Sequence, residues 1–233
     1  MIPISDEIPT RRLPIVTFGL IGINVLVFLF ELMLGSGLDA FFMRWGAVPA
    51  YITDPFSYPL APLTLVTSMF LHGGWMHLIG NMLYLWIFGD NVEDRLGPVL
   101  YAIFYLGAGL VAGLAQVVVA PYSTIPAIGA SGAVAGVLAA YLALFPTAPV
   151  RVLVPGLFMM RVARVPAVIV LGMWFVIQLF NGFLSLGAAT MATGGVAWFA
   201  HIGGFVAGLG VGIAMRVFQR PQLPPPSGYY RSF

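Results

Sequence analysis

The sequence predicts an all-α membrane protein in which six helices cross the bilayer. Of its 233 residues, 60% are hydrophobic and only 8% are charged, and the mean hydropathy is +0.98. A soluble domain typically carries about 25% charged residues. Ten arginines and eight acidic residues therefore cannot cover a water-soluble chain of this size. The apolar residues also gather in six stretches, and almost all arginines lie on one side of the membrane that these stretches define.

A helix that crosses roughly 30 Å of hydrocarbon needs about 20 mainly apolar residues. Six stretches come close to this length; the second is short, but it lies within 55–89, which has no charged residue. The predicted spans are Ile15–Leu34, Trp75–Gly89, Val99–Val119, Ile128–Phe145, Pro166–Leu186 and Val196–Met215.

Arginine placement predicts the orientation. Six crossings put both termini on one side, and that side holds every arginine except Arg44. Because cytoplasmic loops of membrane proteins are enriched in arginine and lysine, both termini should be cytoplasmic, in a multi-pass protein of the cell membrane. The arginines on this side are Arg11, Arg12, Arg95, Arg151, Arg161, Arg164, Arg216, Arg220 and Arg231.

The connecting segments divide the chain into three regions. Residues 1–14 form a cytoplasmic N-terminus, 15–218 the six-span domain, and 219–233 a proline-rich tail that we expect to be disordered. The first outer segment, about 35–74, is rich in aromatic residues and poor in charge, which favours a place in the membrane interface. Asp90–Pro98 reads as a tight inner turn, Pro146–Val165 as an inner loop, and Ala120–Ala127 and Gly187–Gly195 as short outer loops.

Several chemistries are excluded by composition. The chain has no cysteine and no lysine, which removes thiol nucleophiles, Cys-based zinc sites and Ser–Lys pairs. Three histidines without an HExxH pattern fit a metal site poorly, so we expect neither a metal nor a cofactor. A net charge of +2 gives no argument for nucleic acid. The expected partners are the lipid bilayer and other membrane proteins.

Polar residues inside the spans are the functional candidates, because they are costly in hydrocarbon. Four of them fall within roughly 10 Å of the outer boundary at 1.5 Å per residue: His77, Asn81, Ser131 and His201. His72 lies just before the second span. Asn24, Gln116, Gln178 and Asn181 are scattered elsewhere in the spans.

Small residues indicate which spans meet. Gly204 and Gly208 share one face of the sixth span with His201, and Gly132 and Gly136 form a stripe on the fourth. Such stripes let two helix backbones approach closely in lipid. We therefore expect the fourth and sixth spans to pack together and to bring Ser131 beside His201.

This arrangement predicts a Ser131–His201 dyad. A serine hydroxyl becomes a nucleophile when a neighbouring base accepts its proton, and the outer halves of spans two to six hold no carboxylate for a triad. The Ser131 N–H, the Asn81 amide and the His77 ring are candidate oxyanion donors. Each residue alone also has a plainer interpretation: a helix cap for Ser131, interhelical glue for Asn81, a proton relay for a histidine.

Three motifs resemble those of the rhomboid intramembrane serine proteases. The sequence GASG at 129–132 resembles their GxSG motif. The stretch 72–81 resembles HxxxxHxxxN, and 200–208 resembles AHxxGxxxG. Arg44-Trp45-Gly46 and the sequence EDRLG at 93–97 are also similar to family elements. The resemblance runs from the first span to the sixth.

The resemblance implies a six-helix rhomboid-like bundle with an interfacial first loop and a water-filled cavity open to the outer face. It implies a hydrolase that cuts single-span membrane proteins near that face. By motif position, Ser131 is the nucleophile and His201 the general base, while Asn81 and His77 assist the oxyanion. The positions with structural roles near the site are His72, Gly129, Gly132, Gly204 and Gly208. The fifth span and Gly187–Gly195 would form a gate and cap.

Two other function classes use the same polar cavity. A non-proteolytic rhomboid-like protein would bind transmembrane segments without cutting them, and a channel or carrier would pass a small solute. Loss of Ser131 or His201 would have indicated the first, and both are present. A carrier usually needs a buried carboxylate or a broken helix near the midplane, and neither is evident in the sequence.

Overall fold

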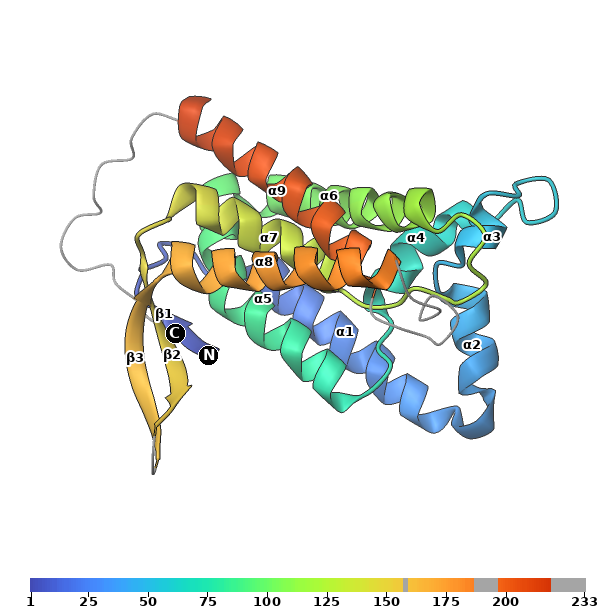
Figure 1. Ribbon diagram of the computed structural model, residues 1–233, viewed down its shortest axis with the longest axis horizontal. Coiled ribbons are helices and arrows are strands. Elements are labelled where there is room, and N and C mark those ends of the chain that lie inside the picture. The colour runs from blue at the N-terminus through green and yellow to red at the C-terminus, as the bar shows by residue number, and fades with distance from the viewer. Residues whose placement is uncertain (157–158, 187–196, 219–233) are drawn as a thin grey trace.

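The computed structural model describes residues 1–156, 159–186 and 197–218, which form a helical bundle with a small sheet at one end (Figure 1). Each predicted span coincides with one helix. Four of these helices are long and apolar enough to cross a membrane: α1 (Ile15–Met33), α6 (Pro98–Val119), α8 (Ala167–Leu186) and α9 (Trp198–Phe218). The other two are α5 (Trp75–Leu96) and α7 (Ser131–Leu144). The predicted outer loop Gly187–Gly195, the first residue of the sixth span and the tail 219–233 lie outside the described residues.

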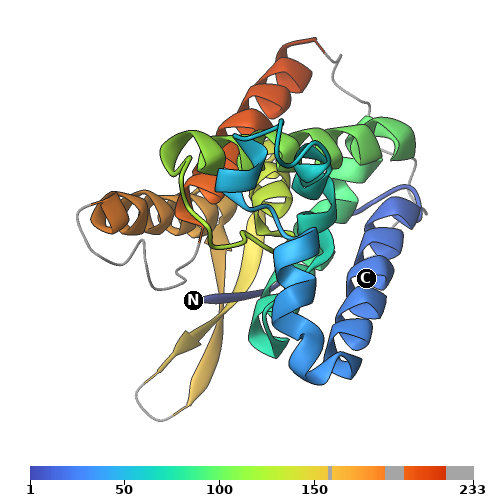
Figure 2. The ribbon, with the colours of Figure 1, turned by 90° about the vertical axis from the view of Figure 1, so that its right-hand side faces the viewer.

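Helix α7 lies at the centre of the bundle. It is only fourteen residues long, and nearly every residue after Ser131 is buried. Glycine and alanine dominate its sequence, so α5, α6 and α9 can approach its backbone from different sides. In Figure 2, which looks along the bundle from the end opposite the sheet, α1 and α8 lie on opposite sides of this centre. Helix α7 is therefore held mainly by α5, α6 and α9.

The predicted turn Asp90–Pro98 is wrong in its extent. Helix α5 continues to Leu96, and the turn is confined to Gly97, whose φ of 77° lies in the left-handed region that suits glycine. Pro98 then occupies the first turn of α6, where no N–H is needed. The charged residues at 93–95 had indicated a solvated turn, but Glu93 and Arg95 are good helix formers and all three residues have partners inside the fold.

One of those partners explains how α1 begins. The N-cap residue of α1 is Pro14, which offers no side-chain hydrogen bond. Instead the buried Glu93 carboxylate accepts the N–H groups of Val16 and Thr17 at 3.0 and 2.8 Å and the Thr17 hydroxyl at 2.8 Å. An anion at a helix N-terminus satisfies the first N–H groups and the helix dipole together. The end of α5 thus fixes the start of α1.

The predicted inner loop Pro146–Val165 is also wrong, because most of it is a β-hairpin. Strands β2 (Pro149–Pro155) and β3 (Met160–Pro166) pair antiparallel, and β1 (Ile2–Asp6) pairs with β2 on its other edge. Val150 and Val152 are buried and Arg151 between them is exposed, the alternation of a half-buried strand. The sheet is tied to α7 by the Tyr141 hydroxyl, which donates to Asp6 at 2.6 Å.

The first outer segment folds into short helices at the end of the molecule opposite the sheet (Figure 1). It is attached to the loop before α7 by main-chain hydrogen bonds. Ala47 and Ala127 exchange two of them at 3.0 and 2.9 Å, and the Gly129 N–H donates to the Ser68 carbonyl at 2.8 Å. The short elements are η1 (Gly35–Gly37), α2 (Leu38–Trp45), α3 (Pro49–Ile52), η2 (Ala61–Leu63), α4 (Thr64–Thr67) and η3 (Ser68–Phe70).

Candidate active site

Ser131 and His201 meet at the end of the bundle nearest the first outer segment. Ser131 is the first residue of α7, and His201 lies in the first turn of α9. The Ser131 Oγ and His201 Nε2 are 2.7 Å apart, which is a hydrogen-bond distance. His201 is buried, whereas Ser131 is partly exposed. The two residues expected to form a dyad are therefore in direct contact.

Glycines bring the two helices together, as the small-residue stripes predicted. An added Cβ on Gly204 would collide with the main-chain oxygen of Gly132, and one on Gly208 with that of Gly136. Gly132 itself has no room, since a Cβ there would lie 2.5 Å from the Ala112 Cβ on α6. Side chains larger than hydrogen would separate α7 from α9. The close crossing sets the Ser131–His201 distance.

Gln178 holds the other side of the His201 ring. Its Oε1 lies 2.8 Å from His201 Nδ1, and its Nε2 donates to the Trp174 carbonyl at 3.3 Å, which fixes the orientation of the amide. Since Oε1 only accepts, Nδ1 carries the proton of the neutral ring and Nε2 is free to accept the Ser131 hydroxyl. Sequence reasoning missed this role. Gln178 had only its position within an apolar span as a signal.

Two tryptophans flank the same imidazole. The Trp174 ring lies 5.9 Å from the His201 ring at an interplanar angle of 39°, and the Trp198 ring lies 6.0 Å away at 89°. Aromatic rings at such distances pack against an imidazole and limit its rotation. The ring of His201 is thus positioned by an amide and by aromatic packing.

His77 faces the loop that precedes Ser131. The Gly73 N–H donates to His77 Nδ1 at 3.4 Å, so the proton of the neutral ring is on Nε2. A Cβ on Gly129 would lie 2.6 Å from that Nε2 and 3.6 Å from Ser131 Oγ. Gly129 also has a φ of 123°, which other residues rarely adopt. Both the backbone and the His77 ring therefore require glycine at this position.

Asn81 lies one helical turn below His77 on α5. Its side chain is buried, and its Nδ2 has no hydrogen-bond partner within the described part of the chain. A buried donor without an acceptor is costly, so such groups are often found where a ligand or a transition state supplies the acceptor. The amide is available for this purpose one helical turn from His77.

His72 is close to the site but does not contact Ser131. Its N–H donates to both oxygens of the buried Glu31 carboxylate at 3.2 and 3.3 Å, and its ring packs edge-on against His77 at 5.0 Å. Glu31 thereby ties the end of α1 to the short stretch that leads into α5. Its contacts are those of a residue that supports His77.

The arrangement can perform acyl transfer. The Ser131 hydroxyl is hydrogen-bonded to His201, a base whose tautomer is fixed by Gln178. Ser131 is also the first residue of α7, and the first N–H groups of a helix have no acceptor inside the helix. The His77 Nε2–H and the Asn81 amide lie on the neighbouring helix. Nucleophile, base, a residue that orients the base, and candidate oxyanion donors are the parts that such a site needs.

Fold and site together define a multi-pass helical membrane protein with a serine–histidine pair between its helices. The Rhomboid domain family matches residues 61–218, and the chain belongs to the rhomboid family. That family includes proteases that act on membrane proteins within the bilayer.

The chain is similar to curated rhomboid proteins from yeast and bacteria. It is 28% identical over 196 residues to "Rhomboid protein 1, mitochondrial" of Saccharomyces cerevisiae, and the matched stretch covers 82% of this chain and 51% of the relative. It is 42% identical over 78 residues to "Rhomboid protease GluP" of Bacillus subtilis, covering 34% of this chain and 15% of the relative. The "Putative rhomboid protease YdcA" of the same bacterium is 32% identical over 78 residues, 34% of this chain and 39% of the relative. The chain thus spans about half or less of each of these relatives.

Proposed function

We propose that this protein is an intramembrane serine endopeptidase that uses Ser131 as nucleophile and His201 as general base. The observation that carries the proposal is the chain of contacts from Ser131 Oγ to His201 Nε2 at 2.7 Å and from His201 Nδ1 to Gln178 Oε1 at 2.8 Å. This order leaves the lone pair of Nε2 directed at the hydroxyl. The neutral His201 ring with its proton on Nδ1 is the tautomer that a general base acting through Nε2 needs.

The reaction follows from these contacts. As Ser131 Oγ attacks the carbonyl carbon of the scissile peptide, its proton passes to His201 Nε2. The carbonyl oxygen becomes an oxyanion, which the Ser131 N–H, the Asn81 amide and the His77 Nε2–H stabilise. His201 then gives the proton to the leaving amine, and an ester between the acyl group and Ser131 remains. Water, deprotonated by His201, hydrolyses that ester and restores the serine.

The proposed substrates are single-span membrane proteins, cut near the outer face of the membrane. Arginines lie on the connections and helix ends near the sheet, while Arg44 lies at the opposite end with the site. By the arginine rule the sheet then faces the cytoplasm and the site faces outward. We propose that α5 and α7 complete six crossings in this arrangement, and that water reaches Ser131, at the start of α7, from the outer side.

The test is cleavage of a generic single-span substrate by the purified protein in liposomes. The wild type should cut at one site and react with a fluorophosphonate probe. Ser131→Ala should lose both activities and still fold, because one hydroxyl is removed from a small-residue site. The matched control is Ser185→Ala, whose hydroxyl donates to the Gly182 carbonyl within its own helix at 2.6 Å.

The competing function is a rhomboid-like protein that binds transmembrane segments without cutting them. It predicts equal substrate binding by wild type and Ser131→Ala, no cleavage and no labelling. Cleavage by Ser131→Ala at the rate of the Ser185→Ala control would disprove serine catalysis.

A further inference from the structure

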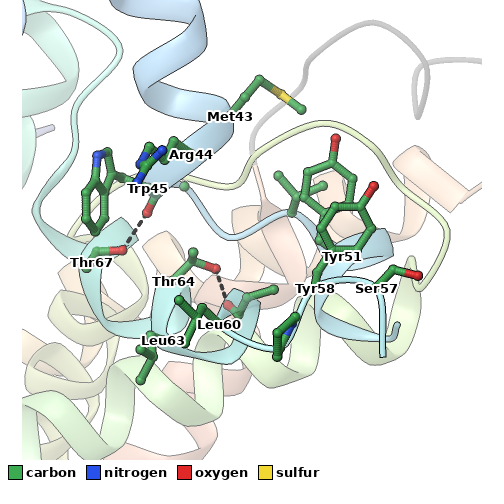
Figure 3. Close-up of a pocket in the computed structure, with 14 residues that line it drawn as sticks. Met43, Arg44, Trp45, Tyr51, Ser57, Tyr58, Leu60, Leu63, Thr64 and Thr67 are labelled. Atoms are coloured by element: carbon green, nitrogen blue, oxygen red, sulfur yellow. Dashed lines mark hydrogen bonds between the residues drawn. The ribbon is translucent and has the colours of Figure 1, made fainter. Parts of the chain in front are cut away.

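The first outer segment contains a cavity of about 590 Å³ that is separate from the dyad (Figure 3). Residues of α2, α3, η2 and α4 surround it, together with the stretch between α3 and η2. Its size is within the roughly 300–1,000 Å³ that is typical of small-molecule sites. Figure 3 shows Arg44 and Trp45 on one side of the opening and the two rings of Tyr51 and Tyr58 on the other.

The wall of this cavity is mainly apolar, and so is the surface around it. Tyr51 and Tyr58 stack with ring centres 4.1 Å apart at 16°, and Leu60 and Leu63 line the floor. Leu60 is 71% exposed, and Phe56 beside the cavity is 98% exposed. Apolar side chains with such exposure are unfavourable in water but favourable at the lipid interface. The cavity therefore opens where lipid is the surrounding medium.

Two kinds of polar group at the cavity, the Arg44 guanidinium and the tyrosine hydroxyls, are hydrogen-bond donors without an acceptor in the described part of the chain. The guanidinium of Arg44 lies 5.6 Å from the centre of the Trp45 ring and forms no ion pair within the described ranges. None of the described residues that line the cavity is acidic. The hydroxyls of Thr64 and Thr67 are already used, since each donates to a main-chain oxygen at 2.6 Å. The phenolic hydroxyls of Tyr51 and Tyr58 have no hydrogen bond in the described part of the chain.

We propose that this cavity binds an anionic phospholipid. The phosphodiester would accept hydrogen bonds from the Arg44 guanidinium and a tyrosine hydroxyl, and an acyl chain would lie on Leu60, Leu63 and the tyrosine rings. A guanidinium matches a phosphate in charge and in the geometry of its donors. A zwitterionic lipid is less suitable, because its ammonium group would find no carboxylate along the lining. A small soluble anion would leave the apolar wall without a partner.

The experiment is native mass spectrometry of the full chain after exchange into phosphatidylglycerol or phosphatidylcholine in detergent. The wild type should retain one phosphatidylglycerol at activation energies that strip phosphatidylcholine. Arg44→Gln should weaken this retention about tenfold, as expected for loss of one charge-assisted contact. The control is Arg161→Gln, which removes the same charge from an exposed position on β3, remote from the cavity.

A second variant separates the cavity from charge alone. Tyr51→Phe combined with Tyr58→Phe keeps the stacked rings but removes both hydroxyls, and it should also weaken retention of phosphatidylglycerol. Equal loss in Arg161→Gln, or full retention in both cavity variants, would disprove the proposal. A lipid-free dimer that Arg44→Gln dissociates would instead identify the occupant as a second copy of the chain and would equally overturn it.

Discussion

Helix α5 carries buried polar side chains near both of its ends, and the surroundings of two of them, Glu93 and Asn81, differ. Glu93, near the sheet, accepts three hydrogen bonds from the start of α1. Asn81, near Ser131, keeps a buried amide nitrogen without a partner in the described chain. Complete pairing of a buried group stabilises a fold, while an unpaired donor costs about 1–3 kcal/mol. The Glu93 end of α5 therefore maintains the architecture, whereas the Asn81 end is ready for a ligand or a transition state.

Replacement of Glu93 should give the largest effect, and it should affect stability alone. Glu93→Ala leaves the N–H groups of Val16 and Thr17 and the Thr17 hydroxyl without an acceptor, so the free energy of unfolding should fall by about 3 kcal/mol. Glu93→Gln keeps one carbonyl oxygen and should lose roughly half as much. Thermal unfolding in detergent measures both variants. An unchanged melting temperature in Glu93→Ala would refute the capping role.

Replacement of Asn81 should show the opposite pattern. Asn81→Ala should lower kcat about 100-fold, or roughly 2.7 kcal/mol, with little change in KM or melting temperature, because the donor acts mainly on the oxyanion. The control is Asn24→Ala in α1, whose amide donates to the Leu20 carbonyl at 2.7 Å. It should lower stability but spare kcat. If Asn81→Ala is destabilised and kinetically normal, Asn81 serves only to hold neighbouring helices together.

Gln178 differs from both Glu93 and Asn81, because it lies at the site and yet its amide oxygen and its amide nitrogen both have hydrogen-bond partners. We expect it to position His201 rather than to contact the substrate. Gln178→Leu should lower kcat about tenfold at constant KM. Gln178→Glu should rescue most of that loss, since a carboxylate oxygen still accepts from Nδ1–H. Equal damage by both variants would argue for packing alone.

Asp6 gives the smallest expected effect, at the sheet end. Burial raises the pKa of Asp6 from 3.8 to about 6, although Tyr141 donates a hydrogen bond to it. The folded state therefore holds this proton more tightly, and its contribution to stability is complete below pH 4 and lost as the pH rises through about 6. Asp6→Asn should flatten the fall in melting temperature between pH 4.5 and 7.

A matched control for Asp6 is Asp54→Asn. Hydrogen bonds from Ser57 lower the pKa of the Asp54 carboxyl from 3.8, so its titration lies below this window. The control should keep the wild-type slope. Identical slopes in the wild type and in Asp6→Asn would mean that another group causes the pH dependence.

Much of this architecture could be predicted because it depends on local composition. Five of the six apolar stretches locate their helices to within three residues, while α5 continues seven residues beyond its stretch, and the glycine stripes predict the contact between α7 and α9. Those signals are contained in short windows of sequence. The placement of Ser131 beside His201 follows from them, since both residues are near the starts of helices that enter from the same end.

The missed features all depend on partners that are distant in sequence. Glu93 is a helix cap only because α1 begins beside it, 76 residues away for Thr17. Gln178 becomes a positioning residue only once α8 packs against α9. The sequence of the hairpin after α7 does contain a local strand pattern, the alternation of valines with Arg151. That pattern is short and bounded by prolines, so it did not distinguish a strand from a loop. Tertiary context determined all three.

The attachment of the first outer segment to the loop before Ser131 has a consequence for how the chain can evolve. Main-chain hydrogen bonds such as those between Ala47 and Ala127 do not depend on side-chain identity. The segment can therefore diverge in sequence while the nucleophile stays in register. Gly46 is the exception, because a Cβ there would lie 2.5 Å from the Phe42 carbonyl oxygen and 2.8 Å from the Pro126 Cβ. New surface specificities could arise across this segment without any redesign of the catalytic centre.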